Sequence, residues 1–258
     1  MSEPGVRTRR EGAVGWLEFN RPPRNVFTPP MIDDALAALE ALQSDAAVRV
    51  VVVGSALPAH FSAGADLALF ADMDTAAQAR WIAQVHQVVR VLRRLSKPVL
   101  AAIGGAAVGG GLEMTLHCDL RFAADDARLG LPEVNLGFIP PMGTTLALPR
   151  LLGRHGAMRF LYAGTMVSAT EAQALGLVDH LVPPADLHAH VQAYAAELAT
   201  KPPEALAAIR RCIAAGPDAA FEAALQLEYE TAVALVQTAN FREGVRAFLA
   251  KRPPQWAG

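Results

Sequence analysis

Apolar residues recur along the first third of the chain in patterns that predict alternating strands and helices. Residues 13–19 read as a strand, and residues 48–54 form a continuous β-branched run that suits a strand covered on both faces. Between them we expect a helix with Thr28 as its N-cap and Pro29 in its first turn. Its predicted buried face consists of Ile32, Ala35, Leu36, Leu39 and Leu42.

The same alternation continues to about residue 124. An apolar stripe over residues 81–95, with arginines and glutamines opposite, predicts a long amphipathic helix. Residues 98–104 are the next buried strand, followed by a glycine stretch, a helix and a further strand at residues 119–124. This order of strand, helix and strand predicts an α/β fold.

The pattern changes after about Gly143, where it becomes almost wholly helical. We therefore expect an α/β core over residues 1–183 and a helical C-terminal region over residues 184–258. The chain has 258 residues, of which 52% are hydrophobic, so a sizeable core can be buried. The C-terminal region is rich enough in apolar residues to predict self-association, notably through Leu225, Leu235, Val236 and Phe248.

Charge and cysteine usage exclude several functional classes. The 23 Lys and Arg residues against 25 Asp and Glu give a formal net charge of -2, which argues against nucleic acid or an anionic membrane as a partner. The polar N-terminus lacks the apolar segment of a secretory signal, so a cytoplasmic location is expected, and no apolar run is long enough to span a membrane. Cys118 and Cys212 belong to no CxxC pattern, so no metal site is expected.

Two glycine loops that follow buried strands are the first candidates for chemistry. They are "HFSAGADL" at residues 60–67 and "GGAAVGGGLE" at residues 104–113. The second loop lacks the Gly-Lys-Ser/Thr ending of a P-loop, and the GxGxxG pattern cannot be placed in it. Close packing of a helix on a strand would also explain the glycines. Alternatively, two such loops could direct two backbone N–H groups at one oxygen, as an oxyanion hole does.

Two glutamates accompany these loops. Glu113 directly follows the glycines near a helix N-terminus, where the helix dipole favours an ionised carboxylate. Glu133 lies 20 residues later beside a proline. Each could be an ordinary surface or first-turn residue. Next to an oxyanion hole, however, the pair could serve as general base and general acid.

Three motifs together resemble the enoyl-CoA hydratase/isomerase (crotonase) superfamily. They are "FSAGADL", "PVLAAIGGAAVGGGLEMTLHCDLRFA" and "LGLPEVNLGFIP", and the closing "FREGVRAFLAKRPPQW" is similar to the C-terminal helix of that family. The resemblance covers nearly the whole chain. It implies an α/β fold, a crotonase-like spiral of repeated ββα units, followed by a helical region that assembles trimers, often paired into hexamers.

The resemblance also implies roles for individual residues. The N–H groups of Ala65 and Gly110 would form the oxyanion hole for an acyl-CoA thioester. Glu113 would activate water and Glu133 would protonate the α-carbon of a 2-enoyl-CoA. No separate cofactor is implied, because coenzyme A is part of the substrate. The implied coenzyme A contacts are Arg24, Val26, Ala63, Asp66 and Leu67, and the candidate acyl pocket comprises Phe27, Leu69, Phe70, Met73, Phe138, Pro141 and Met142.

The chain departs from the family pattern at two places. Relatives usually carry Gly-Ala-Gly-Gly-Thr where this chain has "PMGTT", so Pro141 replaces a glycine whose N–H helps to hold the catalytic water in hydratases. Position 68, often a lysine near the adenine, is alanine, so coenzyme A binding would depend on Arg24 and on Lys251 or Arg252. These departures leave two other enzymatic readings open, an isomerase and a C–C lyase.

The expected partners follow from this reading. They are an acyl-CoA substrate and further copies of the chain in a trimer or dimer of trimers, with no nucleic acid and no membrane. RNA binding, which some family members show, is the alternative from another class. Its candidate basic patch consists of Arg90, Arg93, Arg94 and Lys97, which read more simply as the solvated face of a helix.

Overall fold

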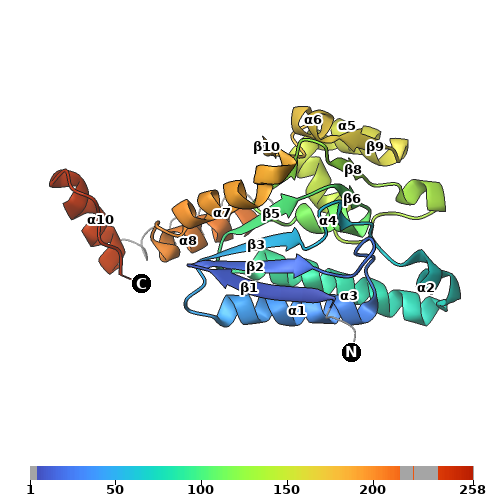
Figure 1. The fold of residues 1–258 in the computed structure, drawn as a ribbon, viewed down its shortest axis with the longest axis horizontal. Coiled ribbons are helices and arrows are strands. Elements are labelled where there is room, and N and C mark those ends of the chain that lie inside the picture. The colour runs from blue at the N-terminus through green and yellow to red at the C-terminus, as the bar shows by residue number, and fades with distance from the viewer. Residues whose placement is uncertain (1–4, 216–222, 224–237, 258) are drawn as a thin grey trace.

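The computed structural model describes residues 5–215, 223 and 238–257, and within these the strands form one sheet of six strands and one of four. The larger sheet has the order β1-β2-β3-β5-β7-β10, and its neighbours are parallel except for the antiparallel β1–β2 pair (Figure 1). The β-branched run predicted as a buried strand is β3. The strands are β1 (Val6–Glu11), β2 (Val14–Phe19), β3 (Val50–Ser55), β5 (Val99–Ile103), β7 (Leu120–Ala124) and β10 (His180–Val182).

The smaller sheet has the order β4-β6-β8-β9, with β9 antiparallel to β8. Strands β3, β5 and β7 of the larger sheet are each followed along the chain by a strand of the smaller one. The backbone therefore winds between the two sheets, which confirms the predicted α/β spiral. The strands are β4 (His60–Ser62), β6 (Ala106–Val108), β8 (Arg128–Gly130) and β9 (Met166–Ser168).

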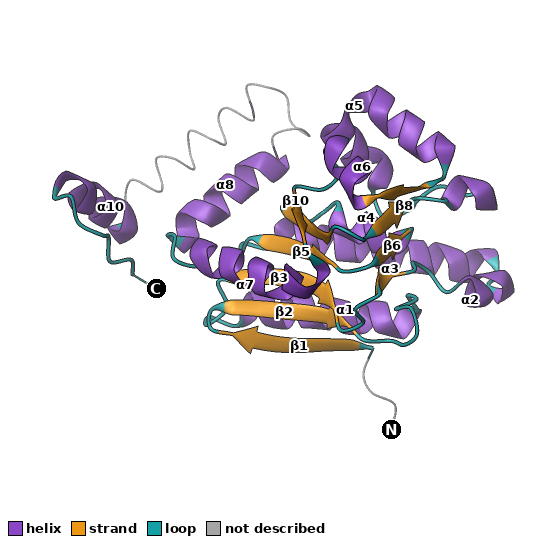
Figure 2. Cartoon of the chain, turned by 45° about the horizontal axis from the view of Figure 1, so that its top comes forward, coloured by secondary structure: helices purple, strands orange, loops and turns teal. Residues whose placement is uncertain are grey.

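Helices cover both faces of the larger sheet. Helices α1 and α3 lie together on one face and α7 crosses the other (Figures 1 and 2), and the core fills the space between these layers. Helix α1 begins as predicted, with Thr28 as N-cap and Pro29 in its first turn. The helices are α1 (Pro29–Ser44), α2 (Leu67–Asp72), α3 (Thr75–Arg94), α4 (Gly110–Thr115), α5 (Thr144–Ala163), α6 (Ala169–Ala174), α7 (Leu187–Leu198), α8 (Pro203–Ala215) and α10 (Ala239–Leu249), with 3₁₀ turns η1 (Glu133–Leu136) and η2 (Pro184–Asp186).

The region after Gly143 is less purely helical than the sequence predicted. Strand β9 joins the smaller sheet, and β10 extends the larger sheet parallel to β7. Each of these strands has three residues, too few to produce a readable alternation of apolar and polar side chains. Strand β1 was also not predicted, because it is an edge strand in which only Val6 is buried. The boundary between residues 183 and 184 stays a prediction.

The side chain of Arg210 fixes α8 to the core. Its guanidinium lies 2.9 Å from the carboxylate of Asp119 and donates to the carbonyl of Leu92 at 2.6 Å, where it closes the C-terminal end of α3. Helix α10 stands apart from the core, at the end of the molecule away from α2 (Figures 1 and 2). Phe248 lies in α10, whereas Leu225, Leu235 and Val236 lie outside the described residues.

Candidate active site

The two glycine loops meet beyond the ends of the neighbouring strands β4 and β6. Gly64 and Gly109 have φ of +80° and +52°, a region that residues with side chains rarely adopt. A β-carbon on Gly64 would lie 2.8 Å from the carbonyl oxygen of Val108 and 3.2 Å from the nitrogen of Gly110. The direct contact between the loops therefore requires a residue without a side chain at position 64.

This contact brings together two backbone N–H groups that the secondary structure does not use. The bridge between Phe27 and Ala65 is made by the carbonyl of Gly64 and the N–H of Asp66, at 2.7 and 3.0 Å, so the N–H of Ala65 lies outside it. Gly110 begins α4, so its N–H has no acceptor within the helix. Both residues line one cavity, in which their N–H groups are available to a ligand oxygen.

Glu113 projects from α4 into a buried position, with 1% of its surface exposed. Its Oε2 accepts hydrogen bonds from the N–H of Met142 at 2.8 Å and from the hydroxyl of Thr144 at 2.7 Å. Burial raises the pKa of Glu113 to about 8, although these two donors favour the ionised form, and the nearby Glu133 raises it further. The carboxyl group is thus placed to exchange a proton close to neutral pH.

Glu133 begins η1 and lies against the second glycine loop. A β-carbon on Gly109 would be 2.7 Å from Oε1 of Glu133, so this turn also requires glycine. Oε2 of Glu133 is buried and has no hydrogen-bond partner in the part of the chain that the structure describes. Burial raises the pKa of Glu133, which favours the protonated acid. A carboxyl oxygen without a partner next to an open cavity is available to a substrate.

A cavity of about 520 Å³ joins these groups, a size typical of small-molecule sites. Both glutamates and both N–H residues border it, and its remaining wall is largely apolar. The predicted site residues that line it are Phe27, Ala63, Ala65, Leu67, Phe70, Gly110, Glu113, Glu133, Phe138, Pro141 and Met142.

Several lining residues were not predicted. Trp81 and Val85 project from α3 on the apolar stripe, which the sequence indicated only as a buried face, and Gln78 lies one turn earlier. Helical spacing shows which side chains are covered but not whether they border a core or a cavity. The other unpredicted lining residues are Gly64, Val108, Gly109, Pro132, Leu136 and Gly137.

Most of the remaining candidates lie near the cavity without lining it. Arg24 is exposed in the loop before Phe27, and its carbonyl accepts from Ala63 at 2.9 Å. Asp66 pairs with Arg21, whose guanidinium also donates to the carbonyl of Val26. Coenzyme A contacts at these residues stay predictions, as does an acyl contact at Met73 or Leu69, because these two residues do not border the cavity.

The two C-terminal candidates lie elsewhere. Lys251 and Arg252 follow α10, far from α2 and its loop within one chain (Figures 1 and 2), and Arg252 bonds to Glu243 at 2.7 Å. Their position gives no support for coenzyme A binding within one chain, and a contact of either residue with coenzyme A stays a prediction. Among the described residues, we find no group of three or more His, Cys, Asp or Glu side chains that could hold a metal ion. No helix in this part of the chain is long and apolar enough to cross a bilayer.

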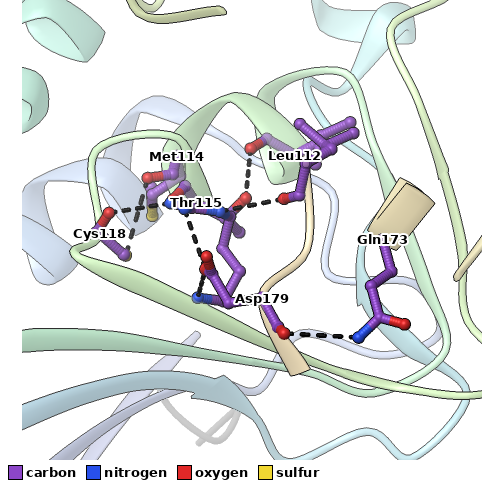
Figure 3. Close-up of polar contacts among 8 residues, drawn as sticks. Leu112, Met114, Thr115, Cys118, Gln173 and Asp179 are labelled. Carbon is purple, nitrogen blue, oxygen red and sulfur yellow. Dashed lines mark hydrogen bonds and ion pairs between the residues drawn. The ribbon is translucent and has the colours of Figure 1, made fainter. Parts of the chain in front are cut away.

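The far end of α4 is anchored by a buried guanidinium. Arg121 donates to the carbonyls of Thr115 and Cys118, at 3.3 and 3.0 Å, and to the carboxylate of Asp179 at 3.0 Å. Figure 3 shows Thr115, Cys118 and Asp179 gathered at this end of the helix. The charge pairing and the backbone contacts hold α4 on β7, and thereby fix Glu113 relative to the sheet.

Comparisons with known proteins show to which family the chain belongs. The family model described as Enoyl-CoA hydratase/isomerase matches residues 9–258. A probable enoyl-CoA hydratase of Bacillus subtilis (strain 168) is 34% identical over 95% of each chain, and an enoyl-CoA isomerase/hydratase of Mycosarcoma maydis is 34% identical over 94% of this chain and 92% of that one. The crystal structure of an enoyl-CoA hydratase from Bacillus anthracis superposes with a TM-score of 0.93 at 32% identity, covering 98% of both chains. The chain therefore belongs to the enoyl-CoA hydratase/isomerase family.

Proposed function

We propose that the protein is an enoyl-CoA hydratase that adds water to a 2-enoyl-CoA thioester. The observation that carries the proposal is the meeting of two buried glutamates and two unused backbone N–H groups at one cavity. Hydration needs a base for water, an acid for carbon and a place for negative charge on the carbonyl oxygen. These four groups supply all three requirements.

The thioester carbonyl would accept hydrogen bonds from the N–H groups of Ala65 and Gly110. The carboxylate of Glu113 takes a proton from water as the water oxygen bonds to C3, and the C2–C3 π electrons move to give an enolate. The two N–H groups stabilise the enolate oxygen. The carboxyl group of Glu133 then gives its proton to C2, so one water is added overall. Proton exchange with solvent restores both glutamates.

Burial raises the pKa of both glutamates, but their hydrogen-bond partners differ. Glu113 accepts two hydrogen bonds on Oε2, and such donors stabilise a carboxylate. Glu133 has a buried Oε2 without a donor, which disfavours its ionised form. We therefore assign Glu113 as the base and Glu133 as the acid.

Double-bond isomerisation is the second candidate. It would move a proton between C2 and C4 with one carboxyl group, and it needs no bound water. The observation in its favour is Pro141, which borders the cavity and has no N–H to offer a water molecule. The relative from Mycosarcoma maydis has both activities in its name.

The same purified protein can decide between these reactions. Linear and branched 2-enoyl-CoA and 3-enoyl-CoA thioesters would be incubated with it, following the conjugated chromophore and the product mass. Hydration predicts loss of the chromophore with a gain of one water, whereas isomerisation leaves the mass unchanged. Glu113→Gln and Glu133→Gln should each lower turnover by roughly 10²- to 10⁴-fold while binding of a saturated acyl-CoA is kept. Near-normal turnover in either variant would remove that glutamate from the mechanism.

The RNA-binding alternative gains no support from the candidate basic patch. Arg93 donates to the carbonyl of Ala214 at 2.8 Å, and Lys97 donates to the carbonyls of Leu42 and Asp45. These cations are engaged within the chain, as expected for residues that stabilise helix ends. A cytoplasmic homotrimer or dimer of trimers acting on acyl-CoA remains our proposal for the protein's setting.

A further inference from the structure

The segment that carries the Met142 N–H to Glu113 has few backbone donors of its own. Residues 140 and 141 are both proline, so neither has an N–H with which to bind its surroundings. The next N–H, that of Met142, donates to Oε2 of Glu113 at 2.8 Å. The position of this donor must therefore be fixed through other atoms of the segment, and the carbonyl oxygens are the remaining polar groups.

Two histidines hold those carbonyl oxygens. Nε2 of His86, on α3, lies 2.7 Å from the carbonyl oxygen of Pro141. Nε2 of His117, just after α4, lies 2.6 Å from the carbonyl oxygen of Met142. A carbonyl oxygen only accepts, so both Nε2 atoms carry a proton. Consecutive carbonyls are thus bound from two separate elements of the fold.

The surroundings of His117 keep it in the form that the contact requires. Its side chain is buried, and burial lowers its pKa to about 4, with the charges of Arg93 and Arg121 lowering it further. The imidazole is therefore neutral at pH 7, with its single proton on Nε2. His86 is half-buried.

We propose that His86 and His117 are positioning residues that hold the Pro141–Met142 segment by its carbonyl oxygens and so keep the Met142 N–H on the Glu113 carboxylate. This inference rests on the proposed function for the role of Glu113. It is distinct from packing alone, because it makes the Nε2–H donor, not the volume of the ring, the necessary feature. Neither histidine lines the cavity.

The electrostatic consequence concerns Glu113. A hydrogen bond to a carboxylate stabilises its charge, so a displaced Met142 N–H raises the pKa of Glu113 above its value in the intact site. The charged and titratable groups near these residues are Glu133 beside Glu113, and Arg93 and Arg121 near His117. None of the substitutions below changes these groups.

The test compares a donor-retaining with a donor-lacking replacement. The amide of His117→Gln can place an N–H near the lost Nε2, whereas His117→Leu cannot. We expect His117→Leu to lower kcat by about 10- to 100-fold. In addition, the ascending limb of its pH–rate profile should move to higher pH, with binding of butyryl-CoA unchanged. His117→Gln should stay within about 3-fold of the wild type, and so should the control His155→Gln, at an exposed position.

Each remaining outcome is decisive. The proposal is wrong if His117→Leu keeps the wild-type kcat and pH profile, or if both His117 variants lose activity equally without a shift of the profile. If His117→Leu does not fold, then His86→Gln and His86→Leu provide the same comparison at a half-buried position. Glu113→Gln, measured in parallel, distinguishes a failure of the proposed function from a failure of the positioning role. If it retains turnover, the proposed function fails, whereas loss of turnover there with unaffected histidine variants overturns only the positioning role.

Discussion

The hydroxyl of Thr144 donates to Oε2 of Glu113 across 2.7 Å, from the first turn of α5 to the first turn of α4. Burial raises the pKa of Glu113 to about 8. Since a general base must be ionised, the pH–rate profile for hydration should have an ascending limb near pH 8. Thr144→Val removes a donor to the carboxylate, so the limb should move to higher pH and kcat/KM at pH 7 should fall about 10-fold. Thr144→Ser keeps the hydroxyl and should preserve both. The pH dependence of kcat/KM tests this, and identical profiles for Val and Ser would contradict it.

The ionisation of Glu113 also affects folding. Burial raises its pKa from the ordinary value of 4.5 to about 8 in the folded protein. The folded state therefore keeps a proton that the unfolded state loses, so the associated stability is complete below about pH 4.5 and is lost as the pH rises through about 8. Glu113→Gln removes this dependence and should unfold at a higher temperature than the wild type at pH 9. The difference should shrink at pH 5, and a difference that does not vary with pH would contradict the burial of an ionisable carboxyl group.

Gly109 and Gly12 provide a matched pair of glycines. Both have positive φ, +52° and +61°, but a β-carbon would be 2.7 Å from Glu133 Oε1 at position 109 and would meet nothing within 4 Å at position 12. Gly109→Ala and Gly12→Ala should each lose about 1–2 kcal/mol of stability through backbone strain. In addition, Gly109→Ala should displace Glu133 and lower turnover about 100-fold. Thermal unfolding and steady-state kinetics measure the two effects.

A double variant identifies the cause of that loss. In a Glu133→Ala background, Gly109→Ala should reduce turnover little further, because the group that it displaces is already absent. An undiminished second loss would place the effect of Gly109 on the neighbouring N–H of Gly110 instead.

Pro141 borders the cavity and has no backbone N–H, so it offers no hydrogen-bond donor to a water bound between the glutamates. We expect slow hydration of short linear 2-enoyl-CoAs by the wild type and faster hydration by Pro141→Gly, by about one to two powers of ten. The rates with crotonyl-CoA provide the measurement. Rapid hydration by the wild type, or a folded Pro141→Gly protein without a gain, would show that the proline does not influence water placement.

Self-association is expected through the C-terminal helices. Ile209 and Ile213 on α8 are 57% and 70% exposed, and Phe241 and Val245 on α10 are also exposed. Light scattering at micromolar concentration should give a trimer or a multiple of it, and Ile213→Glu should shift the mass toward the monomer. The substitution Ile139→Glu, at an exposed position in the loop between η1 and α5, provides a comparison. A monomeric wild type would contradict the prediction.

The sequence predicted those features that depend on local spacing. The start of α1 at Thr28 and Pro29, the buried strand β3 and the two glycine loops follow from nearby residues, and the structure agrees with each. Strands β4, β6, β8 and β9 were not predicted, because a strand of three residues is too short to show a period of apolar and polar side chains. These strands pair because the chain winds back and forth between the two sheets, which local sequence does not reveal.

The site shows the same division between local and distant information. Glu113 and Glu133 could be named from the motifs, but the donors around Glu113 could not. Thr144 and Met142 reach it from about 30 residues away, and His117 binds Met142 across 25 positions. Such contacts become readable only when the fold brings α3, α4 and the start of α5 together.

The pairing of β4 with β6 also sets the width of the site. Ala65 and Gly110 follow adjacent parallel strands, which lie about 4.8 Å apart in any sheet because backbone hydrogen bonding fixes that spacing. The distance between the two N–H donors is therefore governed by main-chain geometry and is insensitive to most side-chain replacements. The walls formed by Phe70, Trp81 and Leu136 are free of that constraint. In the proposed reaction, mutation of these walls can therefore change which acyl group is accepted, while the spacing of the two N–H donors to the thioester stays the same.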